Sequence, residues 1–369
     1  MATPGSLMID SIYPDYDAEQ GLIKPPASVG GELRGRTSQH PGARDAKSHR
    51  SVAAAIAPPA RRPDDSRRRT GRLIGPHGVA EIMTRSGAAD VDVLGSYWTL
   101  AGDVDPLVDE GWSPWDFEDR VRTAAEVGFT GIGIWHDDLF HLLEERSLAD
   151  LREILDAHDI EHVELEFVND WFLDPDDERR RDDVEVRDAL FEAAEVLDAH
   201  HVKMGNLPGT PCDDETLESA FADLVAEAET YGATLAYEIV PSDPNVRDVD
   251  DALALVEGHD EAGVLLDTWH MGKLGIDNER IARIPPEQLV GVELNDGFRE
   301  FDADYSTETT QHRQLPGDGD FDVRGFVDAV RAAGFDGPWG VEVLNAELRT
   351  RPMKELYRTV YDATARYLR

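Results

Sequence analysis

The sequence predicts an α/β protein whose main part is a (β/α)8 TIM barrel, preceded by an N-terminal extension. Short apolar runs rich in Val, Ile and Leu alternate eight times with amphipathic stretches of helical length between residues 91 and 369. Several of these runs are almost continuously apolar, as expected for parallel strands that are buried on both faces. The 279 residues that carry the alternation also match the usual size of such a barrel.

Strands and helices can be assigned in chain order. Eight strands are expected at 91–98, 129–135, 160–168, 200–206, 233–240, 262–268, 289–295 and 339–344. Eight helices are expected at 115–127, 147–157, 184–198, 215–230, 246–257, 278–284, 323–333 and 353–368. Ser147 and Asp150 have the spacing of a capping pair, and Gly263 is one of several glycines expected where a helix stops. A doubly wound open sheet is disfavoured because no G-x-G-x-x-G follows the first strand.

The first part of the chain has a different composition. Residues 1–82 carry 12 Lys+Arg against nine Asp+Glu, whereas the remainder carries 24 against 67. Residues 1–88 also contain two Pro-Pro pairs, runs of arginine, no Trp and no sustained hydrophobic period, so they cannot bury enough apolar surface to fold. We therefore predict a disordered extension at 1–88 and a catalytic barrel at 89–369. A start codon assigned too early, with Met83 as the true start, would produce the same contrast.

Charge and cysteine content exclude several classes of protein. A formal net charge of -40 argues against nucleic acid and anionic membrane surfaces as partners. The single cysteine, Cys212, cannot form an intramolecular disulfide, which favours a reducing, cytoplasmic location. No apolar run reaches the roughly 18 residues of a membrane span. Only five of the 36 basic residues are Lys, and acidic residues crowd the expected loops, which predicts a salt-adapted (halophilic) surface.

Four acidic residues fall at the ends of four consecutive predicted strands, where a barrel of this class has its active site. They are Glu238, Asp267, Glu293 and Glu342. A charged side chain in an apolar strand is costly unless it is paired or bound to metal. The four positions therefore predict one divalent cation, and an all-oxygen ligand set favours Mn²⁺ or Mg²⁺ over zinc. Alternatively, one or two of these carboxylates point into loops or bind backbone amides.

Further polar and aromatic residues near the strand ends are candidates for substrate binding. His270 and His136 follow strands six and two, where a neutral imidazole can polarise a hydroxyl or carbonyl group. Trp135 and Trp269 are expected either to line a pocket for a small polyol or to pack the mouth of the barrel. Lys203, on strand four, is also assigned to substrate binding.

From about residue 91 to 369 the chain resembles the xylose-isomerase-like barrels, specifically the sugar phosphate isomerase/epimerase family. The most specific motifs are YEIVP around Glu238, the D-x-x-H at 267–270, the R-x-x-P-G-x-G at 313–319 and the terminal GVEVLN. The resemblance implies that the four strand-end carboxylates hold one divalent ion. The family's usual ligand on strand seven is a histidine, and Glu293 stands at the matching position here.

The resemblance also implies an activity. It indicates an isomerase or epimerase that acts on a sugar or polyol-derived ketose through a metal-stabilised enediolate, with Glu238 and Glu342 taking and returning the proton. His270 and Arg313 would then hold substrate oxygens. The expected partner is a small sugar or cyclitol, and the sequence leaves open whether the chain forms a homo-oligomer.

Three other functions remain as alternatives. A dehydratase acting on an inosose or 3-dehydroshikimate is the first, because the G-x-G-D-F-D stretch at 317–322 and GVEVLN also resemble those enzymes. An endonuclease-like phosphoesterase is disfavoured by the acidic charge and by the lack of the many histidines that such enzymes use. A non-catalytic sugar-binding barrel is disfavoured because all four carboxylates are present.

The acidic surface gives a prediction about stability. We expect the melting temperature to rise as KCl increases from dilute buffer to about 1 M, because a Debye length of about 3 Å screens repulsion between surface carboxylates. Thermal unfolding followed by circular dichroism over a KCl series measures this effect. A melting temperature that stays flat or falls across the series would contradict it.

Overall fold

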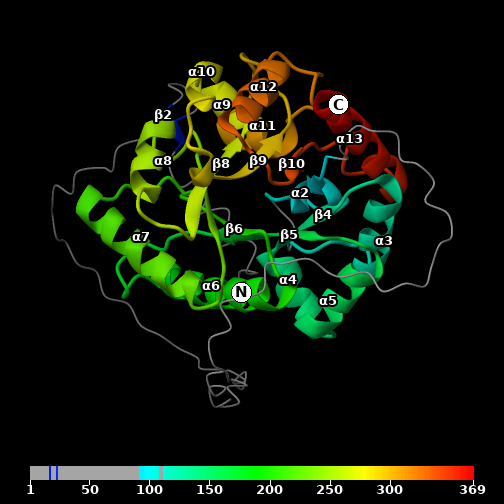
Figure 1. Cartoon of the computed structure of the whole chain (residues 1–369), viewed down its shortest axis with the longest axis horizontal. Coiled ribbons are helices and arrows are strands. Elements are labelled where there is room, and N and C mark those ends of the chain that lie inside the picture. The colour runs from blue at the N-terminus through cyan, green and yellow to red at the C-terminus, as the bar shows by residue number, and fades with distance from the viewer. Residues whose placement is uncertain (1–15, 18–21, 24–90, 108–110) are drawn as a thin grey trace, which may run out of the picture. The chain divides into compact units, whose positions relative to one another are not determined.

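A computed structural model of the chain describes residues 16–17, 22–23, 91–107 and 111–369. The predicted (β/α)8 barrel is confirmed: eight parallel strands form a closed barrel in chain order, and the last strand pairs with the first. Figure 1 shows the strands in the interior of this body, with helices such as α5, α6, α7 and α13 around the outside. The strands are β3 (Val93–Gly95), β4 (Gly131–Trp135), β5 (His162–Val168), β6 (His201–Met204), β7 (Leu235–Glu238), β8 (Ala262–Asp267), β9 (Leu289–Leu294) and β10 (Trp339–Val341).

Each predicted helix has a counterpart in the structure. These are α3 (Phe117–Val127), α5 (Leu148–Ala157), α6 (Glu178–Leu197), α7 (Asp214–Glu229), α8 (Val249–Val256), α10 (Asn278–Ile281), α12 (Val323–Ala333) and α13 (Met353–Leu368). Ser147 and Asp150 form the predicted capping box at the start of α5. Amphipathic helices of this kind bury one face against the barrel, as α3 does with Phe117, Val121 and Ala124.

Several boundaries differ from the prediction. The first strand ends at Gly95, and the following residues form a short helix, α2 (Tyr97–Leu100), instead of continuing to residue 98. Three further short helices, α4 (His136–Leu143), α9 (Thr268–Leu274) and α11 (Tyr305–Gln311), were not predicted. In α9 the reason is local, because the side chain of Asp267 caps the helix by accepting a hydrogen bond from the backbone N–H of His270.

The expectation for Gly263 was wrong. It lies within β8 rather than after a helix, and a Cβ atom there would come within 2.6 Å of the carbonyl oxygen of Gln288. Glycine is therefore required by the close approach of two backbones, not by a left-handed helix end.

Strand alternation orients the acidic residues. Val264 and Leu266 of β8, and Val292 of β9, belong to the core between strands and helices. Since successive side chains point to opposite faces of a strand, Asp267 and Glu293 face the interior of the barrel. These two residues are also direct neighbours in the register of β8 and β9. The alternation thus brings carboxylates from adjacent strands to one level of the barrel.

The N-terminal extension predicted for 1–88 lies outside the described residues, except for residues 16–17 and 22–23. The disorder expected there stays a prediction. Two short strands there, β1 (Tyr16–Asp17) and β2 (Leu22–Ile23), pair in antiparallel orientation. Among the residues that the structure describes, no helix is both long and apolar enough to cross a membrane.

Candidate metal centre and active site

Four carboxylates from the ends of consecutive strands converge inside the barrel. One oxygen from each lies within 4.8 Å of the others, and all four side chains are buried. We call this group the carboxylate cluster; its members are Glu238, Asp267, Glu293 and Glu342. The sequence placed these residues on four strand ends, and the parallel register of the barrel puts them at one place.

Lys203 of β6 lies among these carboxylates. Its ammonium nitrogen is 2.9 Å from Glu342 Oε1 and 3.1 Å from both oxygens of Glu293. It also lies 3.5 Å from Glu238 and 3.7 Å from Glu166. Burial alone would lower the pKa of Lys203, but the surrounding carboxylates, Glu238 first among them, hold it well above its usual value. Lys203 is therefore a fully charged ammonium group in the interior.

Arg313 is the second cation of the site. Its Nη1 donates to Glu342 Oε2 at 2.8 Å and to Asp267 Oδ2 at 3.1 Å. The rest of its guanidinium donates to the carbonyl and hydroxyl oxygens of Thr309 and lies over the ring of Trp269, 5.2 Å from the ring centroid. Arg313 and Trp269 therefore come together on one side of the carboxylate cluster, and Trp269 is fully buried.

His270 and Asn295 orient the carboxylates. His270 Nε2 lies 3.1 Å from Glu238 Oε1. Asn295 donates from Nδ2 to Asp267 Oδ2 at 2.5 Å and to the backbone oxygen of Glu342 at 2.9 Å, so it ties two strands together. His270 Nδ1 and Asn295 Oδ1 are buried without a hydrogen-bond partner, which is costly unless a ligand or water completes them.

The carboxylates differ in their electrostatic surroundings. Burial raises the pKa of Glu342, and burial together with the charge of Glu342 raises the pKa of Glu293 well above its usual range. Burial would also raise the pKa of Glu238, but Lys203 and the hydrogen bond with His270 outweigh it and lower the pKa to about 2. The surroundings therefore favour the ionised form of Glu238 and disfavour the ionised forms of Glu293 and Glu342.

The donor set fits a divalent cation. All four ligands offer oxygen, the donor that hard cations prefer, and Lys203 and Arg313 together neutralise only part of their charge. A bound divalent ion would add positive charge to this group. The carboxylate cluster is thus consistent with a divalent metal site.

The remaining predicted substrate residues lie in a separate aromatic group. Trp135 contacts Trp98 with ring centroids 5.0 Å apart and His136 at 4.2 Å. Nδ1 of His136 accepts a hydrogen bond from the backbone N–H of Phe167 at 3.4 Å, so this nitrogen already has a partner within the protein. Trp135 and Phe167 belong to one small apolar cluster, which does not include Trp269. The aromatic residues predicted at the strand ends therefore belong to two separate groups, one with Trp135 and one with Trp269.

Sequence analysis assigned no role to several residues of the site. Glu166 of β5 is buried, contacts Lys203 and accepts a hydrogen bond from the backbone N–H of Tyr97. Ser96 donates to Glu293 Oε1 at 2.5 Å. Glu166 carried a usable signal, because E-L-E in a buried strand puts two acids on the inward face; Glu164, the other, is paired with His201 at 2.9 Å. Ser96 carried no such signal in the sequence, since a lone serine after a strand is common.

Asp296, another acidic residue at a strand end, has a structural role. Its Oδ1 accepts from the backbone N–H groups of Gly297 and Phe321, and its Oδ2 accepts from that of Gly317. It thereby fixes the loop that contains the R-x-x-P-G-x-G motif.

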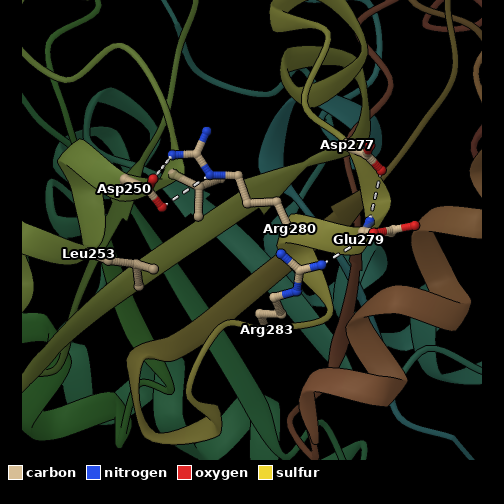
Figure 2. A pocket seen from close by; sticks show the side chains of 7 residues that line it. Asp250, Leu253, Asp277, Glu279, Arg280 and Arg283 are labelled. Carbon is tan, nitrogen blue, oxygen red and sulfur yellow. Dashed lines mark hydrogen bonds and ion pairs between the residues drawn. The ribbon is translucent and has the colours of Figure 1, made fainter.

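A separate cavity of about 320 Å³ lies at helices α8 and α10 (Figure 2). Arg280 reaches Asp250 there, and Arg283 pairs with Glu279 at 3.2 Å. Both arginines are thus paired with neighbouring acids, and the third acid of the lining, Asp277, caps α10 by accepting a hydrogen bond from the backbone N–H of Glu279.

A closed barrel of eight parallel strands with buried acidic residues at the carboxyl ends of four of them belongs to the class of (β/α)8 barrels, which carry their active sites at that end. The chain belongs to the xylose isomerase-like TIM barrel family, whose model matches residues 121–366. This confirms the family resemblance inferred from the sequence motifs.

Two curated proteins illustrate the relationship. The chain is 27% identical over 242 residues to a 3-dehydroshikimate dehydratase of Pseudomonas aeruginosa, a match that covers 64% of this chain and 37% of the dehydratase. It is 24% identical over 236 residues to an inosose isomerase of Bacillus velezensis, covering 62% of this chain and 83% of the isomerase. The match therefore spans well under half of the dehydratase.

Solved structures share the fold. The IolI protein with a bound zinc atom is 20% identical with a TM-score of 0.62, and the match covers 75% of this chain and 98% of that one. A D-allulose 3-epimerase from Methylomonas sp. is 15% identical with a TM-score of 0.55 and the same coverage. At these identities the similarity establishes the barrel alone.

The geometry gives a prediction about metal binding. We expect Mn²⁺ to raise the melting temperature, by the equivalent of about 2.7 kcal/mol at a hundredfold excess over Kd, because the ion relieves repulsion in the carboxylate cluster. Glu342→Gln should remove most of this stabilisation, since it replaces an ionised ligand by an amide. Glu347→Gln is the control, because that residue is exposed and outside the cluster. An equal Mn²⁺ effect in both variants would contradict the prediction.

Proposed function

We propose that the protein is a divalent-metal-dependent isomerase or epimerase that moves a proton at a carbon next to the carbonyl group of a small sugar or cyclitol. The observation that carries this proposal is the convergence of four buried carboxylates from consecutive strands. Glu238 and Glu342 come from the first and last of the strands β7 to β10. Carboxylates from two different strands suit proton transfer to and from different sides of one substrate carbon.

The cluster would hold the ion through Glu238, Asp267, Glu293 and Glu342. When bound, the ion would withdraw electron density from the substrate's carbonyl and so acidify the neighbouring C–H bond. Glu238 and Glu342 would then remove the proton and return it, while His270 keeps Glu238 oriented through its 3.1 Å contact. Burial of these groups excludes water, which strengthens each electrostatic interaction with the substrate.

Substrate contacts outside the cluster are assigned to Arg313 and to the aromatic group of Trp135. Arg313, with Nη2 3.4 Å from His270, would stabilise negative charge that develops on substrate oxygen. Trp135, with His136 beside it, would pack against the apolar face of a small ring or chain. An inosose isomerase and a D-allulose 3-epimerase among the similar proteins bear names that refer to small hydroxylated ketones.

A second candidate is a dehydratase. Two curated relatives, 27% and 25% identical to this chain, are named 3-dehydroshikimate dehydratase. Elimination begins with the same removal of a proton next to a carbonyl, and the hydroxyl group on the following carbon then leaves as water. The same carboxylates and Arg313 would serve both reactions, so the substrate decides between them.

One experiment distinguishes the two reactions. The protein with Mn²⁺ is incubated in D2O with D-fructose, scyllo-inosose and 3-dehydroshikimate in turn, and the products are followed by NMR and ultraviolet absorbance. We expect an isomerase to place deuterium on the carbon next to the carbonyl in a product that retains all its oxygens. A dehydratase would instead give an unsaturated product that has lost water.

Two variants connect this activity to the cluster. Glu238→Gln and Glu342→Gln should each lower kcat by about 10²-fold or more, the usual contribution of a general acid or base. The exposed Glu347→Gln variant is again the control. Full activity in both cluster variants would refute the assignment of the two glutamates.

A further inference from the structure

Lys203 has no donor left for a substrate. An ammonium group has three N–H donors. In this structure its nitrogen lies within hydrogen-bond distance of Glu342 Oε1 and of both oxygens of Glu293, and its side chain is only 1% exposed. Its neighbours on β6, Val202 and Met204, pack in the outer core, so strand alternation directs Lys203 into the barrel. The strand therefore holds this ammonium group permanently among the carboxylates.

The ammonium group shares its partners with the candidate metal site. Three of the four carboxylates that Lys203 contacts, Glu238, Glu293 and Glu342, belong to the carboxylate cluster. A divalent ion on the cluster would draw on the same oxygens and would repel the ammonium group. Two like charges that share ligands oppose each other, and burial strengthens the repulsion.

Glu293 depends on Lys203 more than the other ligands do. In the described residues the hydrogen-bonding and ion-pair partners of its side chain are Ser96 and Lys203. Arg313 reaches Asp267 and Glu342, and no contact of Arg313 with Glu293 is among those described. Among the described residues, Lys203 is thus the cation that contacts the carboxyl group of Glu293.

We propose that Lys203 is a positioning residue, an internal counter-cation that fixes Glu293 and weakens the affinity of the carboxylate cluster for a divalent ion. This inference rests on the metal-dependent function proposed above. It implies that Lys203 stabilises the protein without metal and keeps the ion exchangeable. It also assigns Lys203 to the metal site rather than to substrate binding.

The test compares the full-length protein with Lys203→Met, Glu293→Gln and the double variant, which restores the charge balance. Mn²⁺ affinity is measured by calorimetry, and melting temperature is measured in EDTA. We expect Lys203→Met to bind Mn²⁺ about tenfold tighter or more, because a unit charge is removed within about 4 Å of the shared oxygens. The same variant should melt at a lower temperature in EDTA. The double variant should return to within about threefold of the original affinity and regain most of the melting temperature.

Lys203→Arg is the matched control, since it keeps the charge and should stay near the original affinity. If Lys203→Met does not fold, Glu293→Gln is compared with the double variant, which differs only in the loss of the lysine. The double variant should bind Mn²⁺ about tenfold tighter than Glu293→Gln does.

The outcomes separate this inference from the proposed function. Unchanged or weaker Mn²⁺ binding after loss of Lys203 overturns the inference, even if the original protein depends on metal. Binding of Mn²⁺ by the Lys203→Met variant alone supports the inference and overturns the metal-dependent function of the natural chain. If no variant binds Mn²⁺, both proposals fail.

Discussion

The structure depends on how buried negative charge is balanced inside the barrel. Five carboxylates, those of the carboxylate cluster together with Glu166, surround the ammonium group of Lys203 and the guanidinium group of Arg313. Burying an unpaired charge is far more costly than any single packing interaction, so each strand end is stable only while its partners are in place. The strand register, the loops and the chemistry of the site are therefore linked through one network of ion pairs.

The two cations are held in different ways, and this divides the site. Lys203 is fixed by β6, a strand hydrogen-bonded on both sides within the barrel. Arg313 lies in a loop, held by Thr309, by its stacking on Trp269 and by backbone pairing with Leu344. The two cations nevertheless share Glu342, which Lys203 contacts through Oε1 and Arg313 through Oε2. A change in the loop that released Arg313 would therefore also alter the charge balance around Lys203.

Sequence patterns were sufficient for the barrel and for the four strand-end carboxylates because both follow from local rules. Apolar runs and period-two alternation fix which residues face inward, and Asp267 and Glu293 could be found from them. The role of Lys203 could not, because its partners lie 90 and 139 residues away in the chain and meet it only through the register of the closed barrel. Helix α9 was missed for a related reason: Asp267 is both a strand-end carboxylate of the cluster and the cap of the following helix, and the motif indicates only the first.

The carboxylate cluster and the aromatic residues of the site occupy different positions. In the proposed reaction, the carboxylate cluster and its two cations would serve proton transfer next to a carbonyl, and the similar proteins include both a dehydratase and an isomerase. Under that proposal, selection of the substrate would come from groups outside the cluster. Trp135 packs against Trp98, whereas Trp269 lies beneath Arg313. Among the described residues, Trp269 is the member of these groups that contacts Arg313, so under the proposed function a substrate with an anionic group would be held toward Arg313, whereas a neutral cyclitol would rely on stacking against Trp135.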